Sequence, residues 1–176
     1  CVFQHLIERM PSLASLILLE PLTAAASSAH SPFLKVESFR LLSSIYKHDA
    51  SKSKDNVMSK KAIDAVKRGC NDVVQALKGA LDNSSLHKAK HLDEVLIAIK
   101  NVINYVKSQD GDEILSESDL TSLQQSLKAV GDSRDPGRVK KLCSELASNI
   151  SSLVEGGAKK PNKRTKAPKS SKKAKK

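Results

Sequence analysis

The residues best suited to chemistry are the basic side chains of residues 158–176, AKKPNKRTKAPKSSKKAKK. None of these residues is acidic, aromatic or a large aliphatic residue. Lysine and arginine neutralise phosphates and release the counterions condensed on nucleic acids, so this segment is expected to hold nucleic acid without recognising its sequence. The residues predicted to make these contacts are Lys159, Lys160, Lys163, Arg164, Lys166, Lys169, Lys172, Lys173, Lys175 and Lys176.

The same segment also has the form of a nuclear import signal. Lys163-Arg164-Thr165-Lys166 matches the short K-R-x-K form, and the pairs Lys159-Lys160 and Lys172-Lys173 match the form with two basic clusters. A segment with nothing to bury cannot offset the entropy lost on ordering, and its two prolines disfavour a helix. An extended, disordered arm is therefore predicted, and it serves nucleic-acid contact, nuclear import, both of these, or solubility alone.

The positive charge of the chain is concentrated in this arm. The chain has a formal net charge of +11, whereas residues 1–157 contain 20 basic and 19 acidic residues. The sequence therefore predicts a nearly neutral body that carries a polycation. Within the body, Lys60, Lys61, Lys67 and Arg68 form a modest basic strip interrupted by Asp64, with a similar patch at Lys140-Lys141. Solvated surfaces are favoured over RNA contacts for both.

No other pattern predicts catalysis or a bound metal. His87 and His91 are four residues apart, but Lys88 stands where a metalloprotease helix carries its glutamate. Cys70 and Cys143 lie on apolar stripes and are expected to be buried structural thiols. The chain also lacks the serine elbow and the glycine-rich phosphate loop. We therefore expect no enzyme activity, no cofactor and no metal.

The composition predicts an all-α fold. Hydrophobic residues make up 39% of the chain, but aromatic residues only 3%, so the core must be built from Leu, Ile, Val and Ala. Three widely spaced cysteines are typical of a reducing, intracellular setting, and no run is long and apolar enough to cross a membrane. Because residues 2–7 already resemble the interior of a helix, we expect an upstream region to precede them.

Helical periodicity divides the body into three parts followed by the arm. Residues 1–50 are expected to be helical and to continue from the upstream region. Residues 56–107 predict a long antiparallel hairpin, residues 118–155 a second hairpin, and residues 156–176 the disordered tail. Successive hairpins suggest the end of an α-solenoid of HEAT or armadillo kind, and a compact helical bundle remains the alternative.

Individual residues give more specific expectations. Pro21 is predicted to stop the helix of residues 11–20, which should be deeply packed, and Gly131 to end a helix begun by Ser118 or Asp119. Leu34 is assigned to the apolar side of its helix. The aromatic residues are all expected at core-like positions: Phe3, Phe33, Phe39, Tyr46 and Tyr105.

Three segments together resemble the C-terminal end of one nucleolar family. They are HLIERMPSLASLILLEPL, SPFLKVESFRLLSSIYK and KKPNKRTKAPKSSKKAKK, and the family is called DNA polymerase V (phi) or Myb-binding protein 1A-like, with members in plants. The resemblance implies a nucleolar α-solenoid that acts in rRNA gene transcription or ribosome biogenesis. The family name suggests a polymerase, but this segment has no metal-binding carboxylate motif for nucleotidyl transfer.

These observations lead to three hypotheses about function. The first is a non-enzymatic nuclear or nucleolar scaffold whose arm serves import and sequence-independent binding of DNA or RNA. Its expected partners are nucleic acid, an import carrier and other nucleolar proteins, with no membrane. The second is a protein-interaction module whose helical groove binds a partner, with the tail used only for import. The third is an enzyme whose active site lies upstream.

Overall fold

The structure, a computed structural model, describes residues 2–50, 59–83, 86, 88–109, 114–134 and 137–157, of which residues 49, 50, 89, 156 and 157 are described by their backbone alone. These residues form helices and no strand, so the all-α prediction is confirmed. The helices are α1 (Val2–Arg9), α2 (Pro11–Ser28), α3 (Pro32–Ala50), α4 (Lys60–Asp82), α5 (Ala89–Ser108), α6 (Glu117–Asp132) and α7 (Arg138–Gly157).

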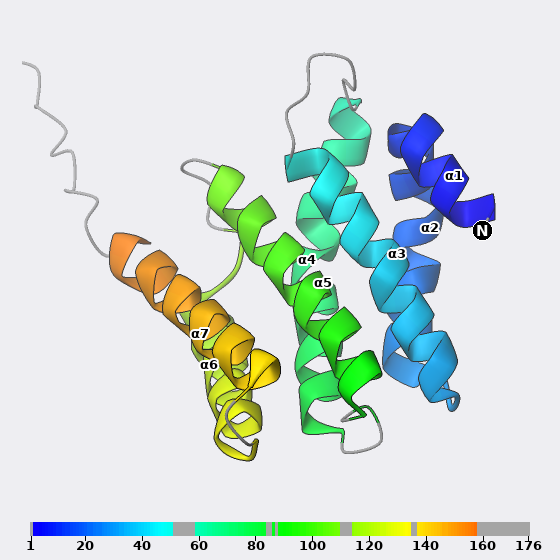
Figure 1. Cartoon of the computed structure of the whole chain (residues 1–176). Coiled ribbons are helices and arrows are strands. Elements are labelled where there is room, and N and C mark those ends of the chain that lie inside the picture. The colour runs from blue at the N-terminus through cyan, green and yellow to red at the C-terminus, as the bar shows by residue number, and fades with distance from the viewer. Residues whose placement is uncertain are drawn as a thin grey trace, which may run out of the picture.

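The helices form two layers (Figure 1). Helices α2, α4 and α6 lie in one layer, and α3, α5 and α7 cover them in the other. The pairs α2/α3, α4/α5 and α6/α7 are therefore three hairpins in a row, and α1 packs on α2 and α3 at one end. Within the described residues, the first and third hairpins make no extensive contact with each other. This linear stack is the arrangement of an α-solenoid rather than of a closed bundle.

Packing between hairpins contributes as much to the stack as packing within them. Helix α5 packs most extensively on α3, and α4 packs more extensively on α2 than on its own hairpin partner α5. The predicted hairpin of α4 and α5 is present, and the two helices run in opposite directions (Figure 1). Their apolar faces, however, mainly cover the preceding hairpin. The buried surfaces of α4 and α5 are therefore wide, because each of these helices contacts several neighbouring helices.

A pair of tyrosines fixes the centre of the stack. Tyr46 of α3 and Tyr105 of α5 are fully buried, and their rings pack edge to face with centroids 5.2 Å apart. The Tyr46 hydroxyl donates a hydrogen bond of 3.3 Å to the carbonyl oxygen of Val66 on α4. Nearby, Asn101 Nδ2 donates to Ser43 Oγ at 2.7 Å. Aromatic packing and satisfied polar groups thus tie three helices of two hairpins together.

Helix α2 continues through Pro21 to Ser28, so the prediction that Pro21 stops it was wrong. Proline lacks an N–H group and therefore frees the carbonyl oxygen of Ile17. Both residues are exposed on this helix, which allows water to bind that oxygen. One turn later, Thr23 Oγ1 donates to the carbonyl oxygen of Leu19 at 2.7 Å. The last turns also contain three consecutive alanines, Ala24 to Ala26, which have a favourable helix propensity.

The start of α6 also differs from the prediction. Ser116 is the N-cap residue, and its hydroxyl accepts a hydrogen bond of 3.1 Å from the N–H group of Asp119. The N-cap therefore lies two residues before Ser118, and the helix begins at Glu117. Asp119 lies in its first turn, where a carboxylate is favoured by the helix dipole. Helix α4 is likewise capped by Ser59, which accepts from the N–H group of Ala62 at 3.3 Å.

The apolar stripes of the later helices are confirmed, whereas those of the first hairpin are only partly buried. Cys70, Cys143 and the large aliphatic residues of the α4, α5 and α6 stripes belong to the core. Leu34, Phe3 and Phe33 are exposed, in contrast to the prediction, and α2 is not deeply packed on all sides. Eight large hydrophobic residues are exposed on α1, α2 and α3 or between α1 and α2. They are Val2, Phe3, Met10, Leu13, Leu16, Ile17, Phe33 and Leu34.

Gly131 allows close helix packing and does not end α6 through a left-handed backbone conformation. The helix continues to Asp132, and the backbone of Gly131 does not have a positive φ. A methyl group on Gly131 would lie 3.2 Å from Cys143 Cβ of α7. Because that β-carbon is fixed to its backbone, only a wider separation of α6 and α7 would relieve this contact.

Two glycine substitutions should therefore change stability in opposite directions. Gly79 is exposed within α4, with no atom within 4 Å of an added methyl group. Gly79→Ala should raise the free energy of unfolding by about 0.5–1 kcal/mol through helix propensity alone. Gly131→Ala should lower it by about 1–2 kcal/mol, because overpacking outweighs the same gain. Urea denaturation of both variants tests the pair, and stabilisation by both would refute the close-packing role of Gly131.

Candidate functional site

The predicted nucleic-acid contacts lie outside the part of the chain that the structure describes. All ten basic residues from Lys159 to Lys176 follow Gly157, the last residue of α7. The structure therefore neither tests their roles nor brings any of them together. Helix α7, which ends at Gly157, lies at the opposite end of the stack from α1 (Figure 1).

The basic strip predicted on α4 lies on a face of mixed charge. Lys60, Lys61 and Arg68 are exposed, but the acidic residues Asp64 and Asp72 are exposed along the same helix. Arg68 Nε donates to the carbonyl oxygen of Asp64 at 3.3 Å, which holds the arginine along its own helix. Alternating charges of this kind are typical of a solvated surface and offer phosphates no continuous positive track.

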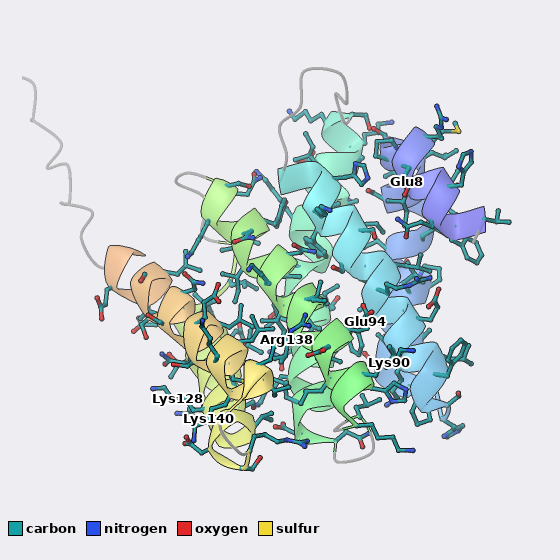
Figure 2. All side chains as sticks on the ribbon, in the orientation of Figure 1. Glu8, Lys90, Glu94, Lys128, Arg138 and Lys140 are labelled. Carbon is teal, nitrogen blue, oxygen red and sulfur yellow. The ribbon has the colours of Figure 1, made fainter. Side chains whose placement is uncertain are left out.

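A smaller basic cluster joins α6 and α7. Lys128 and Lys140 lie side by side in Figure 2 and line a hollow of about 380 Å³, together with Asp132 and several serines. The sequence singled out Lys140 and Lys141 but missed Lys128, because its proximity to Lys140 depends on how α6 packs on α7. The carboxylate of Asp132 offsets part of the positive charge, so this hollow is at most an auxiliary contact for a phosphate.

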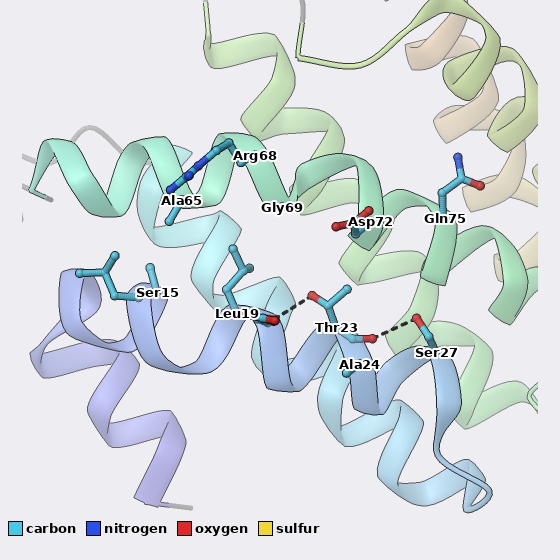
Figure 3. Close-up of a pocket in the computed structure, with 12 residues that line it drawn as sticks. Ser15, Leu19, Thr23, Ala24, Ser27, Ala65, Arg68, Gly69, Asp72 and Gln75 are labelled. Carbon is cyan, nitrogen blue, oxygen red and sulfur yellow. Dashed lines mark hydrogen bonds between the residues drawn. The ribbon is translucent and has the colours of Figure 1, made fainter.

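A groove of about 750 Å³ lies between α2 and α4 (Figure 3). Seven lining residues come from α2 and five from α4, and those on α2 span Ser15 to Ser27, a helical rise of about 18 Å. The floor is formed where the helices approach most closely. A methyl group on Gly69 would lie 2.7 Å from Leu19 Cδ2, so glycine permits this approach.

Small side chains keep the groove open. Ala24 and Ser27 on α2 and Ala65 and Gly69 on α4 leave space between the two helices (Figure 3). Leu16 is half exposed and adds apolar surface at one end. The sequence contained a signal for this groove, namely small residues spaced three or four apart on two helices, but only the packing of α2 on α4 shows that these residues face each other.

Most polar groups of the groove are already satisfied. The hydroxyls of Thr23 and Ser27 donate to carbonyl oxygens of their own helix at 2.7 and 3.0 Å, as the dashed lines of Figure 3 mark. Gln75 Nε2 donates to Asp119 Oδ1 of α6 at 2.9 Å. The carboxylates of Glu20 and Asp72 make no hydrogen bond or ion pair with another described residue. The groove thus offers an apolar floor, with Glu20 on the α2 wall and Asp72 and Arg68 on the α4 wall.

The thiols are suited to packing and not to nucleophilic chemistry. Burial raises the pKa of Cys70 to about 12, while a hydrogen bond from the Tyr46 side chain lowers it slightly. Burial also raises the pKa of Cys143, and the charge of Arg134 acts in the opposite direction. Nucleophilic cysteines have the opposite property, a depressed pKa in an electropositive and accessible site.

The described residues contain no constellation for metal binding. No group of three His, Cys, Asp or Glu side chains converges in this part of the chain. His91 is partly buried on α5, and its predicted companion His87 lies outside the described residues. The described helices also include none with the length and hydrophobicity needed to span a bilayer.

Comparison with known proteins identifies no relative of this chain: no family model, no curated protein and no solved structure matches it.

Proposed function

We propose that this chain is a non-enzymatic nuclear scaffold whose lysine-rich arm holds nucleic acid without sequence preference. The observation that supports the proposal most directly is the distribution of charge. Residues 158–176 contain ten of the eleven net positive charges, and a nearly neutral stack of helices precedes them. A concentrated run of positive charge joined to a nearly neutral body can tether a phosphate polymer through charge alone.

The resemblance of the three segments refines this proposal. It suggests the nucleolus as the location and rRNA gene transcription or ribosome biogenesis as the process. An import carrier and other nucleolar proteins would then be partners in addition to DNA or RNA. The linear stack of hairpins agrees with a scaffolding role, because an α-solenoid presents long surfaces on which several partners can bind.

Nuclear accumulation is expected to depend on the arm. Replacement of Lys163, Arg164, Lys172 and Lys173 by alanine removes the K-R-x-K motif and one cluster of the two-cluster motif. A chain fused to a fluorescent tag too large for passive passage through the nuclear pore should then spread through the cell, whereas the unaltered chain accumulates in the nucleus. Quantitative imaging of the nuclear-to-cytoplasmic ratio measures the effect.

The matched control replaces Lys60, Lys61, Lys140 and Lys141 by alanine. This change removes the same amount of charge from exposed positions of α4 and α7. The control should accumulate normally if import depends on the arm. Nuclear enrichment that survives the four changes in the arm would refute its role in import.

The groove between α2 and α4 favours a second candidate function, a protein-interaction module whose tail serves import alone. An apolar floor lined by two carboxylates and one guanidinium favours a protein segment over a nucleic acid, because the groove carries more negative than positive charge. An RNA pull-down with the whole chain and with residues 1–157 separates the two candidates. RNA captured only by the whole chain supports the scaffold, and no capture by either supports the interaction module.

A further inference from the structure

The groove between α2 and α4 is bordered by two helices that run in the same direction. In Figure 3 the lining residues of α2 run from Ser15 to Ser27, and those of α4 run beside them from Ala65 to Gln75. The starts of the two helices are joined, because the backbone N–H group of Ser59 donates to Ser12 Oγ at 2.8 Å. The groove therefore follows both helix axes for about three turns.

The polar side chains of the groove suit a helical occupant better than an extended one. The hydroxyls of Ser15, Thr23 and Ser27 donate to carbonyl oxygens of α2 itself, at 2.9, 2.7 and 3.0 Å. These donors are therefore not free to pair with the carbonyl oxygens of an incoming extended segment. A covered backbone group without a partner costs free energy, whereas a helix satisfies its backbone groups internally.

The apolar surface of the groove has the size and shape for side chains from one side of such a helix. Leu16 is 49% exposed on the α2 wall, and Leu19 lies at the floor against Gly69. Ala24 and Ala65 are small, so they leave the space above the floor open (Figure 3). A volume of about 750 Å³ is within the range of ligand-binding sites in proteins. Large apolar side chains at helical spacing would fill it.

The charges of the groove call for a basic side chain on the occupant. The carboxylates of Glu20 and Asp72 make no hydrogen bond or ion pair with another described residue. Asp72 lies on the side of α4 that faces α2, whereas Arg68 extends along α4 toward Ala65 and donates to the carbonyl oxygen of Asp64 (Figure 3). A partner that covers a carboxylate without supplying a cation loses free energy, so Lys or Arg on the partner is favoured.

We propose that the groove binds an amphipathic helix of about three turns, with large apolar side chains on one side and a Lys or Arg beside them that meets Glu20 and Asp72. This inference rests on the second candidate function, the protein-interaction module, and names the kind of partner that it takes. The lysine arm of the chain does not fit this description, because residues 158–176 contain no large aliphatic or aromatic residue to fill the groove.

The probe is a phage-displayed library of helical peptides of about 16 residues, built on alanine and glutamine and randomised along one side. It is selected on the immobilised whole chain at about 0.15 M salt, which screens weak contacts with the exposed charges of the body. We expect the selected peptides to combine Leu, Ile, Met or Phe at spacings of three and four with at least one Lys or Arg. Their affinities are then measured by fluorescence anisotropy on variants of the chain.

Two variants change the groove at exposed positions. Glu20→Gln combined with Asp72→Asn removes the carboxylates, and Ala24→Leu fills the open space with a larger side chain. Each should weaken binding of the selected peptides at least about tenfold, the first through lost ion pairs and the second through steric exclusion.

The matched control, Asp64→Asn combined with Glu155→Gln, removes the same charge from exposed positions outside the groove. It should leave the affinity within about twofold of the unaltered chain, because isolated surface charges contribute little. Circular dichroism of every variant verifies that the helices are retained.

The other outcomes overturn the inference in distinguishable ways. Peptides that keep their affinity for both groove variants would bind elsewhere, which leaves an interaction module but not this groove. Acidic peptides would point to the lysine arm as their site. Dimers of the chain in sedimentation that Ala24→Leu abolishes would assign the groove to a second copy. Failure to select any peptide would remove the interaction module as well, while capture of RNA by the arm is measured separately and would be unaffected.

Discussion

Deletion of residues 158–176 is expected to remove nearly all of the affinity of this chain for nucleic acid. The arm has ten positive charges, and the remaining residues carry 20 basic and 19 acidic side chains. If about five to eight of the arm's positive charges contact phosphates, a plot of log K against log salt concentration for duplex DNA should have a slope of roughly −4.5 to −7. Affinity would then fall roughly 500- to 20,000-fold between 50 and 200 mM salt.

The measurement is a salt titration with two unrelated DNA duplexes and one single-stranded RNA. The chain should bind both duplexes equally, because an arm without aromatic residues or a fixed helix has no means of distinguishing bases. The truncated chain should show a nearly flat dependence on salt. A strong preference for one duplex, or a slope unchanged by the deletion, would place the binding site on the helices.

Two variants of the arm serve as controls for its length and its charge. Replacement of its lysines by arginine should preserve most of the affinity, because binding through net charge does not require the planar geometry of guanidinium. Replacement of the same lysines by glutamine keeps the length and should reproduce the deletion. Lys60→Gln with Lys61→Gln on α4 should change the slope little, since these residues lie on a face of mixed charge.

Truncation of the buried face of α5 is expected to have the second largest effect. Leu96 and Ile99 are completely buried, as the periodicity predicted, on the helix that packs most extensively against α3. Leu96→Ala or Ile99→Ala should lower the free energy of unfolding by about 2–5 kcal/mol, through lost apolar burial and the cavity that remains. Urea denaturation followed by circular dichroism measures the loss.

The same helix contains a matched control. Ile97 is 38% exposed and differs from Ile99 mainly in burial, so Ile97→Ala should cost roughly 1 kcal/mol or less. Lys90→Ala, at an exposed position of α5 (Figure 2), should cost under roughly 0.5 kcal/mol. Similar losses for Ile97→Ala and Ile99→Ala would show that α5 is packed on a different side from the one described.

The two candidate functions use separate parts of the molecule. The arm follows α7 in the sequence, and α7 lies at one end of the stack, whereas the groove between α2 and α4 lies near the other end (Figure 1). A partner in the groove would leave the arm free to bind nucleic acid. The body therefore has room to act as a scaffold that joins a protein segment to a phosphate polymer, which is the way in which both candidates would operate together.

The sequence by itself determined the helical class and most of the helix faces. Residues such as Val66, Leu77, Leu96 and Ile99 recur at helical spacing, and burial follows directly from that spacing because one side of each helix must leave water. The concentration of charge after residue 157 also required no structure, since net charge depends on composition alone.

Only the tertiary structure decided which helices pack together and where packing stops. Leu34 and Leu41 share one side of α3, yet Leu34 is exposed and Leu41 is buried, because neighbouring helices do not cover that side along its whole length. Pro21 remained within α2 because its neighbourhood tolerates a freed carbonyl. Gly69 forms the floor of a groove only because α2 crosses it. The spacing of apolar residues specifies which side of a helix is buried, whereas the helix that covers this side lies far away in the sequence.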